Sequence, residues 1–81
     1  MSSSTPQSTL FQRVVEASGL AALFGASTIR RACSRAGVAS PEQMSIADLE
    51  RALPTIEQAL RIYLPPDEVE GRLRAVRALA R

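Results

Sequence analysis

An all-α fold, a compact bundle or orthogonal array of four main helices with short connections, is predicted by three features of the 81-residue sequence. Ala, Leu, Arg and Glu dominate the composition, while glycine, proline and aromatic residues are sparse. Apolar residues recur three and four positions apart, which is the helical period, and no segment has the alternation typical of a strand. We expect one helical domain over residues 9–81, preceded by a disordered polar tail over residues 1–8.

The first predicted helix begins near Thr9, a favourable N-cap, and ends at Gly19, which suits the left-handed position after a helix. The apolar residues between them fall on one side of the helix. The following stretch LAALF is expected to form a separate short turn that ends at Gly25.

A second main helix is predicted over residues 28–36, with Ser27 as its N-cap and Gly37 after its last turn. Val38 is expected to fold back toward Cys33, the apolar contact that accompanies such a helix end. The narrow apolar stripe of this helix comprises Ile29, Ala32, Cys33 and Ala36. The opposite half of the helix carries Arg30, Arg31, Ser34 and Arg35.

The longest predicted helix begins at Ser45, which forms a capping box with Asp48. A single turn is expected just before it, at SPEQ. Pro54 removes one backbone hydrogen bond inside the helix, so we expect a kink or a break near Leu53. The apolar seam of this helix follows a heptad spacing and comprises Ile46, Leu49, Leu53, Ile56, Leu60 and Tyr63.

The segment LPPDEVEG ends the long helix and begins the last one. Acidic residues crowd the first turn of the last helix and arginines follow, which is the charge order that the helix dipole favours. The buried stripe of this helix is predicted to contain Val69, Leu73 and Val76, with Leu79 or Ala80.

Enzymatic chemistry is not expected, because the sequence has no histidine and no lysine to act as a general base or amine nucleophile. One cysteine and dispersed carboxylates do not provide the converging ligands of a metal site. We therefore expect no catalytic residue, no metal, no cofactor and no small-molecule substrate. Cys33 belongs to an apolar stripe and is expected to be buried and inert, although nearby arginines would make an exposed thiol reactive.

A cytoplasmic location is the expectation from the cysteine count and from the N-terminus. Cys33 has no partner for an internal disulfide, and the first residues lack the basic and apolar regions of a signal peptide. The longest apolar stretch, residues 19–26, is too short to span a bilayer, so no membrane association is expected.

The stretch LAALFGASTIRRACSRAGV has a small residue, Ala21, then Gly25 four positions later, then Ser27 before an arginine-bearing helix. In these features it resembles the helix-turn-helix family. The family has a buried Ile or Val six positions after the turn glycine, where this sequence has Arg31. The resemblance implies DNA or RNA binding by the second helix, through Thr28, Arg30, Arg31, Ser34 and Arg35.

Charge is segregated along the chain, which gives a different interpretation of the same arginines. Residues 9–38 carry a net charge of +3 from four arginines and one glutamate, whereas residues 39–64 carry −2 from two arginines and four acids. Such regions can pair within one chain or between two copies. Exposed pairs add little stability, but they set register and the choice of partner.

These observations favour a non-catalytic helical module for protein–protein interaction, an adaptor that binds another protein or a second copy of itself. The expected binding surface combines arginines with part of the apolar seam, namely Arg30, Arg31, Arg35, Leu53, Ile56 and Leu60. For the seam residues, ordinary core packing is the competing interpretation. A small DNA- or RNA-binding protein using the helix-turn-helix-like segment is the alternative function, and nucleic acid is the less expected partner.

Overall fold

The predicted all-α fold is confirmed by a computed structural model, which describes residues 9–80 except for the side chains of residues 22 and 23. The predicted disordered tail over residues 1–8 lies outside the described residues. Within residues 9–80 there is no strand, and the helices are α1 (Leu10–Ser18), α2 (Ala22–Arg35), α3 (Ile46–Tyr63) and α4 (Pro66–Ala78). A short 3₁₀ helix, η1 (Pro41–Gln43), lies at the predicted SPEQ turn.

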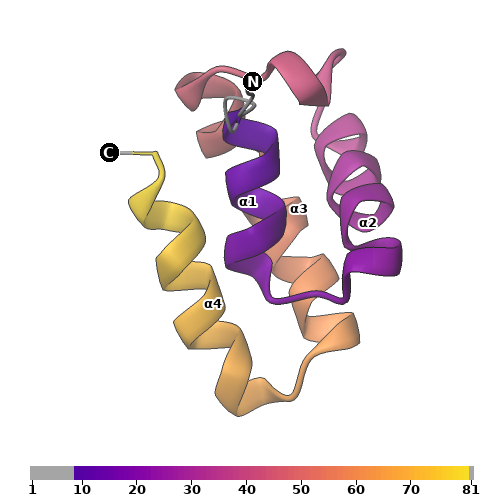
Figure 1. Cartoon of the computed structure of the whole chain (residues 1–81). Helices are drawn as coiled ribbons and strands as arrows, with labels where there is room; N and C mark the ends of the chain where they lie inside the picture. Colours follow the sequence, from indigo (N-terminus) through magenta and orange to yellow (C-terminus); the bar gives the residue numbers. More distant parts are fainter. Residues whose placement is uncertain (1–8, 81) are drawn as a thin grey trace, which may run out of the picture.

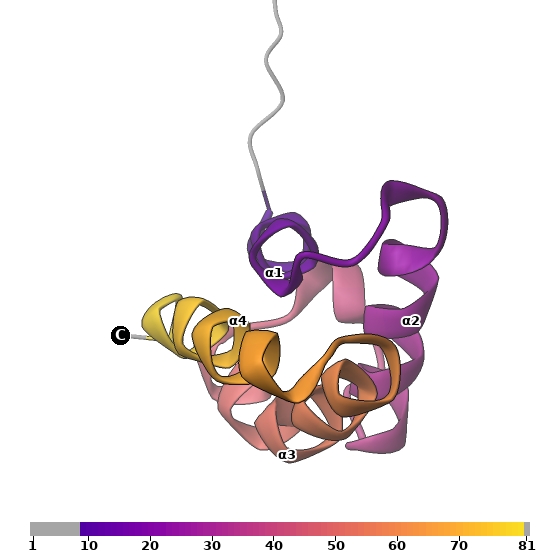
Figure 2. The same cartoon turned by 90° about the horizontal axis from the view of Figure 1, so that it is seen from below.

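The four α-helices form a closed ring in which each helix packs against the next in sequence and α4 packs back against α1 (Figures 1 and 2). The 3₁₀ helix η1 contacts α1 and α2. Buried apolar side chains from all four α-helices form one cluster at the centre of the ring. Short connections suffice for this arrangement because sequential helices are also spatial neighbours.

Most of the predicted helix ends are confirmed. The Thr9 hydroxyl accepts a hydrogen bond from the Gln12 backbone, and Ser45 and Asp48 form a reciprocal capping box at the start of α3. After α2, Gly37 has a left-handed φ of 93°, and the Val38 N–H donates to the Cys33 carbonyl at 2.9 Å. These bonds satisfy backbone groups that every helix end leaves free.

The predicted interruption at Gly25 is wrong, because α2 runs without a break from Ala22 to Arg35. Ser27 therefore lies inside the helix, where its hydroxyl donates to the Phe24 carbonyl instead of acting as an N-cap. Gly25 is needed for a different reason: a Cβ there would lie 3.3 Å from Leu20 Cβ and 3.4 Å from Val15 Cγ1. The glycine allows the chain around α1 to approach α2 closely.

The break expected at Pro54 is also wrong, since α3 is continuous from Ile46 to Tyr63, and the expected kink is not confirmed. Pro54 is exposed, so it lies on the solvent side of the helix. On that side, water can hydrogen-bond to the carbonyl of Glu50, which the missing proline N–H leaves without its helical partner. The cost of the proline is therefore lower than in a buried helix.

The core contains most of the predicted apolar stripes. In α3 the fully buried residues are Leu49, Ala52, Ile56 and Leu60, whereas Leu53 is half-buried and Ile46 and Tyr63 are exposed. Ile29, Ala32 and Cys33 contribute from α2, and Val69, Leu73 and Val76 from α4. Ser18 is a buried polar residue, and its hydroxyl donates to the Val15 carbonyl at 2.6 Å and accepts from the Leu20 N–H.

We predict that Gly19→Ala destabilises the protein, whereas Gly71→Ala stabilises it. Gly19 ends α1 with φ 73°, and an added Cβ would lie 2.5 Å from Arg72 Nε of α4. The left-handed conformation alone costs an alanine about 1–2 kcal/mol. Gly71 lies inside α4 with open space around it, so alanine there should gain about 0.5–1 kcal/mol. Denaturant unfolding of both variants measures the difference, and equal free energies of unfolding would contradict it.

Candidate functional site

The structure divides the six predicted partner-binding residues between the core and the surface. Ile56 and Leu60 have no exposed surface, and Leu53 is half-buried against the core. The central part of the α3 seam thus faces the centre of the ring, whereas its end residues Ile46 and Tyr63 are exposed. For Ile56 and Leu60 the structure agrees with the competing interpretation, ordinary core packing, because this face of α3 packs against the other helices.

Arg30 is occupied within the chain. Its guanidinium lies 2.6 Å from the Glu42 carboxylate of η1 and 5.3 Å from the centre of the Phe11 ring of α1. The hydrogen bond from Arg30 lowers the pKa of Glu42 below its ordinary value. Ser34 lies beside the same pair, at a hollow shared with Arg30 and Glu42. These residues thus belong to the side of α2 that faces η1.

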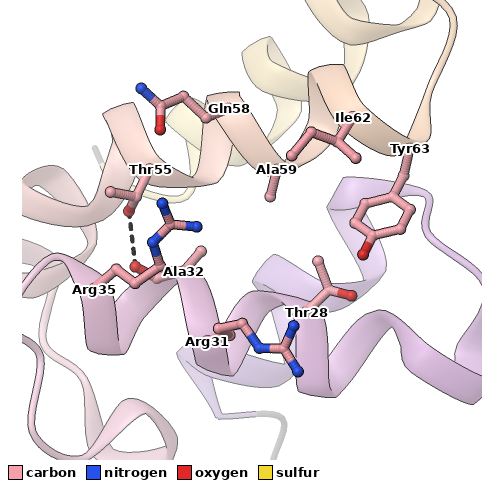
Figure 3. A pocket seen from close by; sticks show the side chains of 9 residues that line it. All are labelled: Thr28, Arg31, Ala32, Arg35, Thr55, Gln58, Ala59, Ile62 and Tyr63. Atoms are coloured by element: carbon pink, nitrogen blue, oxygen red, sulfur yellow. Dashed lines mark hydrogen bonds between the residues drawn. The ribbon is translucent and has the colours of Figure 1, made fainter.

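Arg31 and Arg35 lie instead along a groove between α2 and α3 (Figure 3). Thr28 and Ala32 complete the α2 wall, and the groove encloses a hollow of about 150 Å³. The α3 wall consists of Thr55, Gln58, Ala59, Ile62 and Tyr63. We call these nine residues the α2–α3 groove. Of the five residues assigned to nucleic-acid binding, Thr28, Arg31 and Arg35 line it, whereas Arg30 and Ser34 do not.

Large apolar side chains are exposed at the end of the groove where α3 ends. Ile62 is 72% exposed, Tyr63 is 48% exposed and Phe24, from the first turn of α2, is 39% exposed. The rings of Phe24 and Tyr63 pack together with their centres 5.4 Å apart. Our sequence interpretation missed Ile62 and Phe24 as surface residues. The signal was present at Ile62, which is apolar but lies outside the three-and-four spacing of the α3 seam.

Small and hydrogen-bonded residues hold the two walls together at the other end. The Thr55 hydroxyl lies 2.8 Å from the carbonyl oxygen of Ala32 (Figure 3). It lies equally close to the carbonyl oxygen of Ala52 and shares its one hydrogen between the two. Ala32 is buried and Ala59 is half-buried, so short side chains lie where α2 and α3 approach each other. The two helices that bound the groove are therefore joined by a direct hydrogen bond.

Arg31 and Arg35 have no acidic partner among residues 9–80, a property that they share with Arg13, Arg72, Arg74 and Arg77. Among residues 9–80, ion pairs join Arg30 to Glu42 at 2.6 Å, Arg61 to Glu57 at 2.6 Å and Arg51 to Asp48 at 3.8 Å. No carboxylate of the described residues lies within 4.0 Å of the Arg31 or Arg35 guanidinium. The groove thus combines two arginines without acidic partners on α2 with the exposed apolar side chains of Ile62 and Tyr63 on α3.

The Cys33 thiol and the metal-ligating side chains are weaker candidates for a functional site than the groove. Cys33 is fully buried, and burial, followed by the charges of Asp48 and Glu42, raises the pKa of its thiol to about 11. A thiol of that acidity is a poor nucleophile at neutral pH. Within the described part of the chain, no three His, Cys, Asp or Glu side chains lie close enough to hold a metal ion. No helix of residues 9–80 has the length and apolar character needed to cross a membrane.

Comparisons of the chain with protein-family models, with curated proteins and with solved structures found no match. Function is therefore inferred from the groove itself.

Proposed function

We propose that this chain is a non-catalytic protein–protein interaction module that binds its partner through the α2–α3 groove. The observation that supports the proposal best is the 72% exposure of Ile62 beside Arg31 and Arg35, two arginines without an acidic partner among residues 9–80. Neither feature contributes to the core of the ring. A partner that covered Ile62 would remove its apolar surface from water, and acceptor groups on the partner could bond to the two guanidinium groups.

The composition of the groove fits a protein interface. Aromatic residues and arginine are enriched at interface centres, and residues with large binding effects are most often Trp, Tyr and Arg. Tyr63 and Arg31 supply these types in the same groove as Ile62, and Phe24 packs against Tyr63. Burying the exposed apolar area of Ile62 in particular would contribute about 1 kcal/mol or more to binding.

Nucleic acid is a less suitable partner for this surface. Phosphate binding depends on the number of cationic side chains that reach one backbone. Arg30 is occupied by Glu42, which leaves Arg31 and Arg35 as the arginines of α2 at the groove. Ile62, which is apolar and neighbours them, has no favourable role against a phosphate backbone. We therefore expect no more than weak background binding to duplex DNA.

The test is a selection of random peptides displayed against the intact protein, followed by measurement of each selected peptide against two variants. We expect Ile62→Ser to weaken the selected peptides at least tenfold, because serine removes the apolar contact at the groove. The matched control is Ile46→Ser, which changes an isoleucine of the same helix that is 45% exposed but lies at its other end.

Both isoleucines are exposed, so neither change should alter the thermal unfolding of the protein by more than a small amount. Selected peptides that bind equally to the Ile62→Ser variant would contradict the groove as the binding surface. A salt-sensitive complex with duplex DNA that depends on Arg31 and Arg35 would replace the proposal with the nucleic-acid function.

A further inference from the structure

We infer that the partner segment of the α2–α3 groove is a short amphipathic helix with an acidic edge. This inference rests on the proposed function and adds the chemical class of the partner. Three properties of the groove carry it: the spacing of its free arginines, its length, and the absence of backbone groups with which an extended peptide could pair.

The arginines set the charge pattern of the partner. Arg31 and Arg35 are four residues apart on α2, so they lie on one side of the helix about 6 Å apart along its axis. Two carboxylates spaced by four residues on a partner helix have the same separation. Each could accept a charge-assisted hydrogen bond from one guanidinium, a stronger contact than a neutral pair provides.

The chain does not satisfy these arginines by itself. Glu42, Asp48 and Glu57 are already paired with arginines other than Arg31 and Arg35. The continuous helix α2 holds Arg31 and Arg35, so the separation of their Cα atoms is fixed before binding. A partner with matching acids would then bind without first displacing an ion pair of this chain.

The length of the groove sets the length of the contact. Thr55 and Tyr63 bound the α3 wall and are eight residues apart, which corresponds to about 12 Å along the helix, or two helical turns. The hollow of about 150 Å³ is similar in size to cavities that hold one benzene-sized group. It therefore suits one large apolar side chain, with a second packing on the exposed Ile62.

An extended peptide is not favoured. Strand addition needs the free N–H and C=O groups of a sheet edge, and residues 9–80 contain no strand. Both walls of the groove are helices whose backbone groups bond within the helix. Recognition must therefore use side chains, and a helix presents apolar residues four apart on one face with acids beside them.

The experiment uses two capped, fluorescently labelled, alanine-rich peptides of about sixteen residues, long enough to be partly helical. Each carries two leucines four residues apart on one face. The acidic peptide has two glutamates four apart beside the leucines, and the neutral peptide has glutamines there. By fluorescence anisotropy, we expect the acidic peptide to bind the intact protein at least tenfold more tightly than the neutral one.

The variants locate the contact. Arg31→Gln combined with Arg35→Gln should remove the tenfold preference, since glutamine keeps helix propensity but has no charge. The control is Arg74→Gln combined with Arg77→Gln, which makes the same charge change on α4, away from the groove. This control should keep the preference for the acidic peptide, whereas a general attraction of acidic peptides to a cationic protein would be reduced by both double variants.

The outcomes separate the partner class from the proposed function. Equal binding of both peptides, lost in Ile62→Ser, would overturn the acidic helix and leave the groove as the binding surface. No binding of either peptide, or binding that Ile62→Ser does not affect, would overturn both. A rise of the protein's own mass with concentration in light scattering, abolished by Ile62→Ser, would assign the groove to a second copy of this chain instead.

Discussion

Leu60→Asp is expected to unfold the protein, whereas Ile62→Asp, two residues later on the same helix, should leave it folded. Leu60 is fully buried in the centre of the helical ring, and Ile62 is 72% exposed beside the groove. Replacing a buried leucine by alanine already costs about 2–5 kcal/mol, and an aspartate there adds the cost of burying a polar group without a partner. A chain of 81 residues has a total stability of about 4–12 kcal/mol, so this loss is most or all of it.

Circular dichroism as a function of temperature measures this prediction. The wild-type protein and Ile62→Asp should show the same cooperative loss of helix, and Leu60→Asp should show little helix at any temperature. Ile29→Asp should behave like Leu60→Asp, because Ile29 is fully buried on the facing side of α2. A cooperative, wild-type-like transition for Leu60→Asp would show that the α3 seam does not form the core.

The helix ends could be predicted from the sequence because each depends on a few neighbouring residues. A cap such as Thr9 or Ser45 bonds to a backbone N–H three residues away, and Gly37 satisfies the end of α2 through residues already adjacent to it. No long-range contact has to be known for these bonds to form. The apolar stripes of α2, α3 and α4 were predictable for a similar reason, since helical periodicity alone defines them.

Gly25 and Pro54 could not be interpreted correctly from local signals. A glycine favours a helix end when nothing else constrains it. At position 25, however, glycine is favoured because Leu20 and Val15 leave little room for a larger side chain. That contact exists only once the chain before α2 has packed against it. Pro54 is tolerated because it faces solvent and the buried residues around it hold α3 in place. In both cases tertiary packing overrides a local preference.

The candidate site was predictable in part. The arginines of α2 stand out in the sequence, but which of them is free depends on Glu42, which comes close to Arg30 only when η1 packs on α2. The sequence could not decide between a partner surface and the core for the apolar side of α3, because a heptad seam has the same pattern in both cases. Ile62 could have been identified as an apolar residue on the polar side of the helix.

The buried thiol of Cys33 is expected to make the free energy of unfolding depend on pH. Burial raises the pKa of its thiol to about 11 in the folded protein, compared with 9.0 for the ordinary thiol. Well below pH 9 the thiol is protonated in both states and does not affect the pH dependence of the free energy of unfolding. Between pH 9 and pH 11 the unfolded chain loses this proton first, so the unfolded state is favoured as pH rises.

The expected loss of stability from pH 9 to pH 11 is on the order of 2 kcal/mol, since each unit of pKa difference corresponds to about 1.4 kcal/mol and the loss is completed only above pH 11. Guanidinium chloride unfolding at a series of pH values measures it, with Cys33→Ala as the control. The alanine variant should be less stable at pH 8 because it leaves a small cavity, but it should lack the additional alkaline loss that the thiol causes. The sequence contains no lysine and one tyrosine, so few other groups titrate in this range and the comparison is clear. Equal alkaline slopes for the two proteins, or rapid labelling of Cys33 by a thiol reagent under native conditions, would show that the thiol is accessible and that α2 does not bury it.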